Sequence, residues 1–216
     1  IHGRRANVVN LVRKNTKVFL LLSGKNDFEM LVNKFREAGI NHVKISAGYR
    51  LSYPDEKLFT FYLDEFETKL FDLPEGVYTC LIENEACEEQ ILTPGMDDEI
   101  FSRTKVPMTK NEVRVLSISR LELTKNAVVY DVGSGTGSVS AECARLSPDI
   151  FVFAIEQKEE AANLTKENAV RLGLSDQIVV INKKAPEGFE ELPTPTHVFI
   201  GGSSGALSDI LSAIQK

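Results

Sequence analysis

Cysteine is scarce in this chain of 216 residues, which has only three. Cys80, Cys87 and Cys143 are odd in number and lack the spacing of metal ligands. A disulfide framework and a cysteine metal site are therefore not predicted. We expect the three cysteines to be reduced, as in a cytoplasmic protein.

Long apolar runs and an excess of positive charge are also lacking. Apolar runs such as Val18 to Leu22 are far shorter than the ~18 residues of a membrane span, so no membrane association is predicted. The formal net charge of −6 gives no support to nucleic-acid binding. A hydrophobic content of 43% fits a globular protein of one or two domains. Because the chain starts at Ile1 without methionine, we expect it to be a fragment.

The sequence is organised around AVVYDVGSGTGS, residues Ala127 to Ser138. Ala127 to Asp131 has the apolar, β-branched composition of a buried parallel strand, and Ser138 to Leu146 is typical of a helix. The glycines between them make a tight turn that lets a ligand lie against bare backbone, facing helix N–H groups. Strand, glycine turn and helix together predict half of a nucleotide-binding unit.

The spacing of this turn distinguishes between ligands. The dinucleotide fingerprint is G-x-G-x-x-G, whereas here the order is D-x-G-x-G-x-G, with Ser138 in place of the third glycine. A carboxylate at Asp131 would repel a pyrophosphate but tolerate a sulfonium with an ammonium group. Glu156, at the end of the strand Ile150 to Ile155, suits two ribose hydroxyls. This pattern resembles motif I of class I S-adenosylmethionine (SAM) methyltransferases, and a structural turn in an unrelated α/β domain is the alternative.

The chain divides into two predicted domains, residues 1–94 and 95–216, with a solvated linker at Thr93 to Glu99. The first has strands at Lys17 to Leu22, His42 to Ser46 and Tyr78 to Glu83, with a helix at Asp27 to Ala38. In the second, strands alternate with helices, which predicts a doubly wound parallel sheet. Its further strands are Gln177 to Asn182 and His197 to Ile200, the latter pairing with Ala127 to Asp131.

Just before this sheet lies a basic cluster: Arg103, Lys105, Lys110 and Arg114. The sequence T-K-N-E predicts a capping box, with Thr109 as N-cap and Glu112 reaching back.

Three further segments identify a family. Lys105 to Arg114 (KVPMTKNEVR), Asp131 to Ser140 (DVGSGTGSVS) and Phe199 to Gly205 (FIGGSSG) resemble the precorrin-6Y methyltransferases (decarboxylating) of cobalamin biosynthesis. The first domain resembles the second lobe of a tetrapyrrole methylase, through IHGR at residues 1–4, YPDE at 53–56 and LIEN at 81–84.

The resemblance implies that the second domain binds SAM, releases S-adenosylhomocysteine, and methylates carbon 15 of a precorrin-6 type tetrapyrrole. It also implies decarboxylation of the acetate on carbon 12, carbon-5 methylation by the intact leading partner, and a homo-oligomer. We expect no single catalytic residue, because SAM brings its own electrophile. Since the substrate carries several carboxylates, cationic recognition groups are expected. The cofactor-binding residues we expect are Asp131, Gly133, Ser134, Gly135, Thr136, Gly137, Glu156, Gln157, Lys184, Ala185, Gly201 and Gly202; the substrate-binding residues are Thr109, Lys110, Arg114 and Ser203.

Some features depart from the family. Four strands are predicted where the class has seven, so we expect a truncated sheet and an incomplete substrate pocket. The first lobe of the leading methylase is absent, so we expect the first domain to be inactive alone. Lys184 stands where such enzymes often carry an acid or amide near the adenine. A SAM methyltransferase of another small acceptor, an NAD(P)-dependent Rossmann oxidoreductase and a non-catalytic scaffold remain as alternatives.

Overall fold

The structure is a computed structural model, and it describes residues 7–66, 73–87 and 93–215. The chain forms two compact units, divided between Gln90 and Ile91. The predicted boundary at residue 95 lies a few residues further along. The IHGR segment at residues 1–4 lies outside the described residues.

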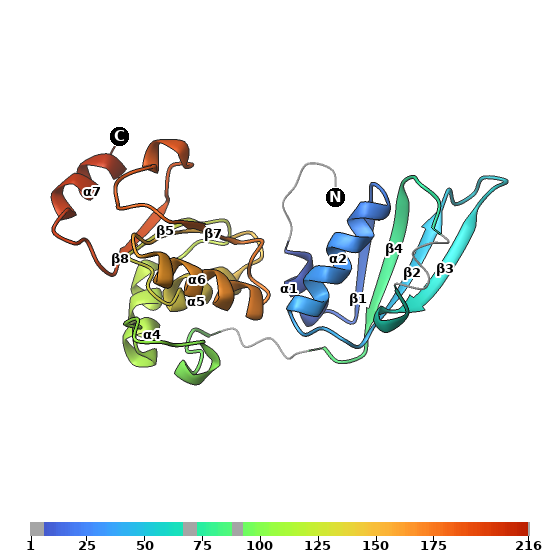
Figure 1. The fold of residues 1–216 in the computed structure, drawn as a ribbon, viewed down its shortest axis with the longest axis horizontal. Helices are drawn as coiled ribbons and strands as arrows, with labels where there is room; N and C mark the ends of the chain where they lie inside the picture. The colour runs from blue at the N-terminus through green and yellow to red at the C-terminus, as the bar shows by residue number, and fades with distance from the viewer. Residues whose placement is uncertain (1–6, 67–72, 88–92, 216) are drawn as a thin grey trace. The chain divides into compact units, whose positions relative to one another are not determined.

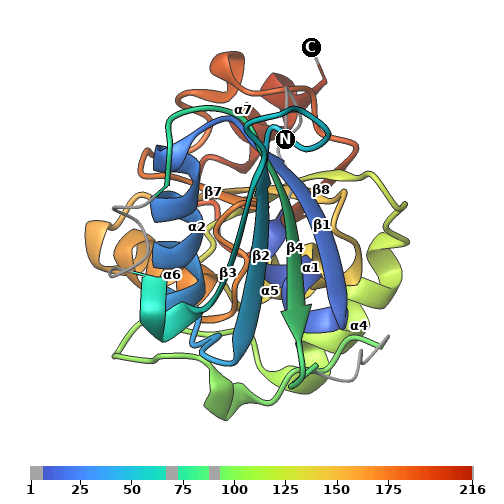
Figure 2. The same cartoon turned by 90° about the vertical axis from the view of Figure 1, so that its right-hand side faces the viewer.

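The first unit is an antiparallel sheet with two helices on one face. Its strands run in the order β1-β4-β2-β3 (Figure 2). The helix predicted at Asp27 to Ala38 is confirmed as α2 (Lys25–Glu37), in which Phe28, Leu31, Val32 and Phe35 are buried. The elements are α1 (Val8–Lys14), β1 (Lys17–Leu22), α2 (Lys25–Glu37), β2 (Val43–Tyr49), β3 (Lys57–Tyr62), the 3-10 turn η1 (Leu63–Glu65) and β4 (Tyr78–Asn84).

The second unit is the predicted doubly wound parallel sheet, in the order β7-β6-β5-β8. The helices α5 and α6 cover one face, while η3 and α7 contribute to a core on the other (Figure 1). The elements are η2 (Asp98–Ile100), α4 (Asn111–Leu121), β5 (Val128–Val132), α5 (Ser138–Leu146), β6 (Phe151–Ile155), α6 (Glu159–Arg171), β7 (Ile178–Ile181), η3 (Phe189–Glu191), β8 (His197–Ile200) and α7 (Leu207–Ile214).

The strand order places a topological switch between β5 and β8. The chain passes outward through β5, β6 and β7, then returns to pair β8 with the free side of β5, as predicted. Asp131 of β5 lies opposite Phe199 of β8 in the register. In such sheets, ligands bind at the carboxyl ends of the strands beside the switch.

Two local predictions are wrong. Residues 93–99 are not a solvated linker, because the backbone amides of Gly95 and Met96 donate to the buried carboxylate of Glu142 at 3.0 and 2.6 Å. The capping box is also absent: α4 begins one residue later, with Lys110 as an N-cap that makes no side-chain capping bond. The Thr109 carbonyl oxygen instead accepts a hydrogen bond from Arg114.

No helix in the described ranges is both long and apolar enough to cross a membrane.

Candidate functional site

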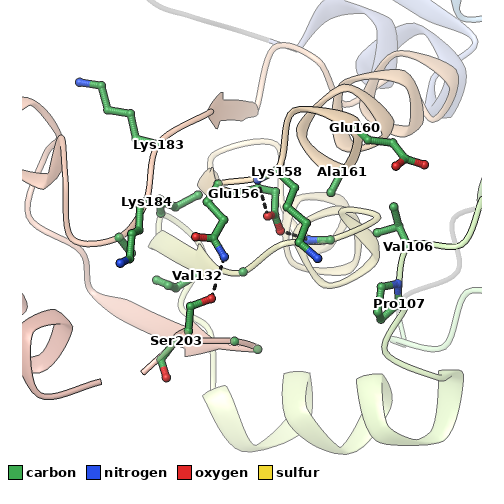
Figure 3. Close-up of a pocket in the computed structure, with 18 of the residues that line it drawn as sticks. Val106, Pro107, Val132, Glu156, Lys158, Glu160, Ala161, Lys183, Lys184 and Ser203 are labelled. Carbon is green, nitrogen blue, oxygen red and sulfur yellow. Dashed lines mark hydrogen bonds between the residues drawn. The ribbon is translucent and has the colours of Figure 1, made fainter. Parts of the chain in front are cut away.

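A cavity of about 440 Å³ opens at the carboxyl ends of β5, β6 and β8 (Figure 3). Its walls come from the glycine turn after β5, the segment after β6, the loop after β7, the loop after β8 and the segment before α4. The lining residues are Lys105, Val106, Pro107, Val132, Gly133, Gly135, Ile155, Glu156, Gln157, Lys158, Glu160, Ala161, Lys183, Lys184, Ala185, Gly201, Gly202, Ser203 and Ser204.

Close backbone packing shapes the floor of this cavity. The Gly133 amide donates to the Ile155 carbonyl at 2.8 Å, and the Gly201 amide donates to the Val132 carbonyl at 2.8 Å. Gly133 has a φ of +76°, and a Cβ atom there would lie 2.8 Å from the backbone nitrogen of Gly202. Glycine is therefore required at this position by both conformation and space.

Glu156 is the acidic group of the floor. It is 8% exposed, and its two carboxylate oxygens accept hydrogen bonds from the Gly135 and Lys158 amides at 3.1 and 2.9 Å. Each carboxylate oxygen has a further lone pair. The carboxylate is thus oriented by the backbone and can still accept hydrogen bonds from a ligand's hydroxyl groups.

The other side of the cavity is bridged by side chains. Gln157 Nε2 donates to Ser204 Oγ at 2.7 Å, joining the segment after β6 to the loop after β8. Asn182 Nδ2 donates to the Glu156 carbonyl oxygen at 2.8 Å, which fixes the chain directly behind the acid.

The structure brings together most of the predicted cofactor residues. Those that line the cavity are Gly133, Gly135, Glu156, Gln157, Lys184, Ala185, Gly201 and Gly202, along with Ser203 from the predicted substrate set. The remaining predicted residues lie elsewhere, for three different reasons.

Asp131 does not line the cavity. Strand side chains alternate between faces, and this one lies toward α5, where it is 1% exposed and accepts a hydrogen bond from Ser140 Oγ at 2.5 Å. Its Oδ1 atom has no hydrogen-bond partner within the described ranges. Burial raises the pKa of Asp131 to about 6, Ser140 opposes this shift, and the charge of Glu156 adds to it. A direct contact with the cofactor is therefore not supported.

Ser134, Thr136 and Gly137 also lie outside the cavity lining, because this part of the turn packs against α6. Ser134 Oγ lies 3.3 Å from Thr165 Oγ1. The Thr136 carbonyl accepts from Asn168 Nδ2 at 2.9 Å. A Cβ at Gly137 would lie 2.7 Å from Thr165 Cγ2. These residues hold the turn in place rather than facing a ligand.

Arg114 is part of a buried network and not a substrate-facing cation. Its side chain is 0% exposed, and its Nη1 atom donates to Asp98 Oδ1 at 2.8 Å and to the Thr109 carbonyl at 2.7 Å. Its Nε atom lies 3.5 Å from Glu142 Oε1, and its Nη2 atom donates to the Met96 carbonyl. Although burial opposes the shift, the hydrogen bonds from Arg114 and Lys110 hold the pKa of Asp98 below its usual value.

Lys110 and Thr109 are likewise not among the cavity-lining residues. The Lys110 ammonium pairs with Asp98 at 3.3 Å. Substrate contact by these two residues stays a prediction, because a basic cluster in a sequence does not reveal which of its members have internal partners. The cavity residues that the sequence did not predict are Val106, Pro107, Lys158, Glu160, Ala161, Lys183 and Ser204. The available signal was proximity in the sequence: Val106 and Pro107 follow Lys105, and the other five lie close to Glu156, Lys184 or Ser203.

Within the described ranges, no cluster of three or more His, Cys, Asp or Glu residues could hold a metal ion. The strand order, the glycine turn and the acid after the second strand define a Rossmann-like domain of the class I SAM-methyltransferase type.

Comparison with known proteins identifies the family. The model of the precorrin methyltransferase domain matches residues 99–216, which is more than half of the chain. This chain belongs to the precorrin methyltransferase family.

Two similar curated proteins carry closely related names. The chain is 46% identical over 123 residues to the "Probable cobalt-precorrin-6B C(15)-methyltransferase (decarboxylating)" of Pyrobaculum calidifontis, covering 56% of this chain and 63% of that protein. It is 41% identical over 117 residues to the cobalt-precorrin-6B C(15)-methyltransferase (decarboxylating) of Salmonella typhimurium, covering 54% and 59%. The chain therefore spans about three fifths of the length of these relatives.

A solved structure shares the fold. The precorrin-6y C5,15-methyltransferase of Geobacter metallireducens aligns with a TM-score of 0.53 and 37% identity, covering 56% of this chain and 62% of that one.

Proposed function

We propose that the second unit is a SAM-dependent methyltransferase domain of cobalamin biosynthesis that acts on a precorrin-6 type tetrapyrrole, with decarboxylation of a ring acetate. The observation that carries this proposal is the cavity itself, in which a glycine turn and the backbone-held carboxylate of Glu156 lie side by side. The names of the relatives supply the substrate class.

The residues present fit SAM. Glu156 would accept hydrogen bonds from the ribose hydroxyls, because its carboxylate is already oriented by two amides. Gly133 and Gly135 would allow close approach of the methionine part to the backbone. Ala185 and its neighbours would border the adenine. SAM supplies an electrophilic methyl group, and the protein binds it and orients an electron-rich ring carbon toward it.

Calorimetric titration with S-adenosylhomocysteine tests the cofactor assignment. Glu156→Ala is expected to weaken binding by about 1–3 kcal/mol through lost charge-assisted hydrogen bonds. Glu159→Ala is the matched control, since Glu159 is exposed and does not line the cavity. Unchanged affinity in a folded Glu156→Ala variant would contradict the assignment, and binding of NAD instead would favour the oxidoreductase alternative.

Two further parts of the proposal concern the setting of this domain. We propose that the first unit is one lobe of a tetrapyrrole methylase, which predicts that this unit methylates carbon 5 of the tetrapyrrole when the other lobe of such a methylase is present. We also propose a homo-oligomer in the cytoplasm, in keeping with the free cysteines of the chain. Light scattering coupled to gel filtration tests the oligomeric state.

A further inference from the structure

The cavity carries a positive charge that the rest of the chain does not. Four lysines and two glutamates line it, a net charge of +2, in a protein whose formal net charge is −6. The lysines are Lys105, Lys158, Lys183 and Lys184.

These lysines differ in whether they have a partner. The Lys183 ammonium lies 3.4 Å from Glu191, and Figure 3 shows this side chain directed away from the other labelled cavity residues. Lys105, Lys158 and Lys184 make no ion pair within the described ranges. Of the two acids, Glu156 is held by backbone amides and Glu160 accepts from Thr104 Oγ1 at 3.0 Å.

The three unpaired lysines come from three separate segments around the opening. Lys105 precedes α4, Lys158 is the residue before α6, and Lys184 follows β7. All three are exposed, whereas Glu156 is buried. The cations therefore surround the entrance, while the groups suited to the cofactor form the floor.

We propose that Lys105, Lys158 and Lys184 are the carboxylate receptor of this site and bind the acidic side chains of a tetrapyrrole substrate. This inference rests on the proposed function and assigns substrate recognition to these lysines instead of the buried Arg114. Lysine suits this role because its point charge on a flexible stem adapts to carboxylates placed around a ring. A cationic entrance also attracts an anionic substrate from a distance.

The probe for this proposal is uroporphyrin, a tetrapyrrole with acetate and propionate side chains, and its fully esterified form is the uncharged control. Binding is followed by fluorescence at several salt concentrations. Each Lys→Gln change at these three positions is expected to raise Kd by about 1.4- to 5-fold, as for exposed ion pairs. The triple variant is expected to raise Kd by about tenfold and to reduce the salt dependence of binding.

A matched triple variant controls for net charge. Lys57→Gln, Lys125→Gln and Lys166→Gln remove the same charge from exposed positions that do not line the cavity. The proposal expects this control to bind uroporphyrin as the unaltered chain does. It also expects the Lys105→Gln and Lys158→Gln variants, whose side chains are not assigned to the cofactor, to bind S-adenosylhomocysteine normally.

Four results would overturn the receptor. They are equally weakened uroporphyrin binding in the control triple variant, equally weakened S-adenosylhomocysteine binding in the Lys105→Gln or Lys158→Gln variant, equal binding of the esterified ring, and no uroporphyrin binding by a chain that binds S-adenosylhomocysteine. Failure of the proposed function has a different signature. In that case the unaltered chain does not bind S-adenosylhomocysteine, whatever the lysine variants do with uroporphyrin.

Discussion

Replacing Arg114 with alanine is expected to destabilise the second unit strongly, although Arg114 touches no ligand-facing surface of the cavity. The guanidinium joins α4 to Asp98, Met96 and Glu142. Removing it leaves the Glu142 carboxylate, which is 0% exposed, with only the two backbone amides of residues 95 and 96 and a side-chain ion pair with Arg145 at 3.6 Å. Breaking a buried ion pair in this way costs about 3–5 kcal/mol.

The assay must separate the two units, and the cysteines make this possible. Cys143 is buried in the second unit and Cys80 in the first. Burial raises the pKa of Cys80 to about 12 and also raises that of Cys143. Since the thiolate is the reactive form, both label mainly after unfolding. Pulsed thiol labelling along a urea gradient, read by mass spectrometry, then gives one midpoint for each unit.

Arg114→Ala is expected to lower the Cys143 midpoint by about 2 M urea, taking an m-value of about 2 kcal/mol/M. The Cys80 midpoint should stay unchanged. Arg120→Ala is the control, because Arg120 lies on the same helix but is exposed, and its effect should stay within about 0.5 kcal/mol. If the Arg114→Ala and Arg120→Ala midpoints for Cys143 coincide, the network does not stabilise the unit. If the alanine variant is unfolded without urea, the graded loss is measured with Arg114→Lys.

Three more predictions use the same Cys143 readout. Because the pKa of Asp131 rises to about 6 on folding, from an ordinary value of 3.8, the folded state binds more protons between those pH values. The free energy of unfolding should therefore fall by about 3 kcal/mol as pH rises through that window. If Asp131→Asn leaves the pH dependence of stability unchanged, Asp131 is not its cause. Gly133→Ala should destabilise the unit and weaken S-adenosylhomocysteine binding, because a Cβ would lie 2.8 Å from Gly202; normal affinity and stability would contradict the packing argument. Gln177→Leu should cost about 1–3 kcal/mol, since the two N–H groups of its buried Nε2 are shared among three carbonyl oxygens at 2.7–2.8 Å; a midpoint equal to that of the unaltered chain would count against it.

Sequence patterns predicted the fold of the second unit because local signals and long-range pairing agree there. Buried parallel strands are short apolar runs, and glycines mark the turn where a side chain would clash. The alternation of strands and helices leaves few allowed topologies. The pairing of β8 with β5 and the position of Glu156 at a strand end followed from these rules and were confirmed.

The site was predicted only where the backbone decides which way a residue faces. Gly133, Gly135 and Glu156 line the cavity because the strand ends and the turn place them there. Asp131 is one strand position before Val132, which lines the cavity. The Asp131 side chain faces α5 instead. A single step along a strand reverses the face of a side chain, so motif membership alone was not enough.

The sequence by itself determined that this chain contains a doubly wound sheet with a glycine turn and an acid at the next strand end. Only the tertiary structure decided which cations are internal and which are available. Arg114 lies in the same basic cluster as Lys105, but it meets Asp98 and Glu142, which are 16 and 28 residues away along the chain. A buried charge needs such partners, and which partners meet it depends on packing between segments that are distant in the sequence.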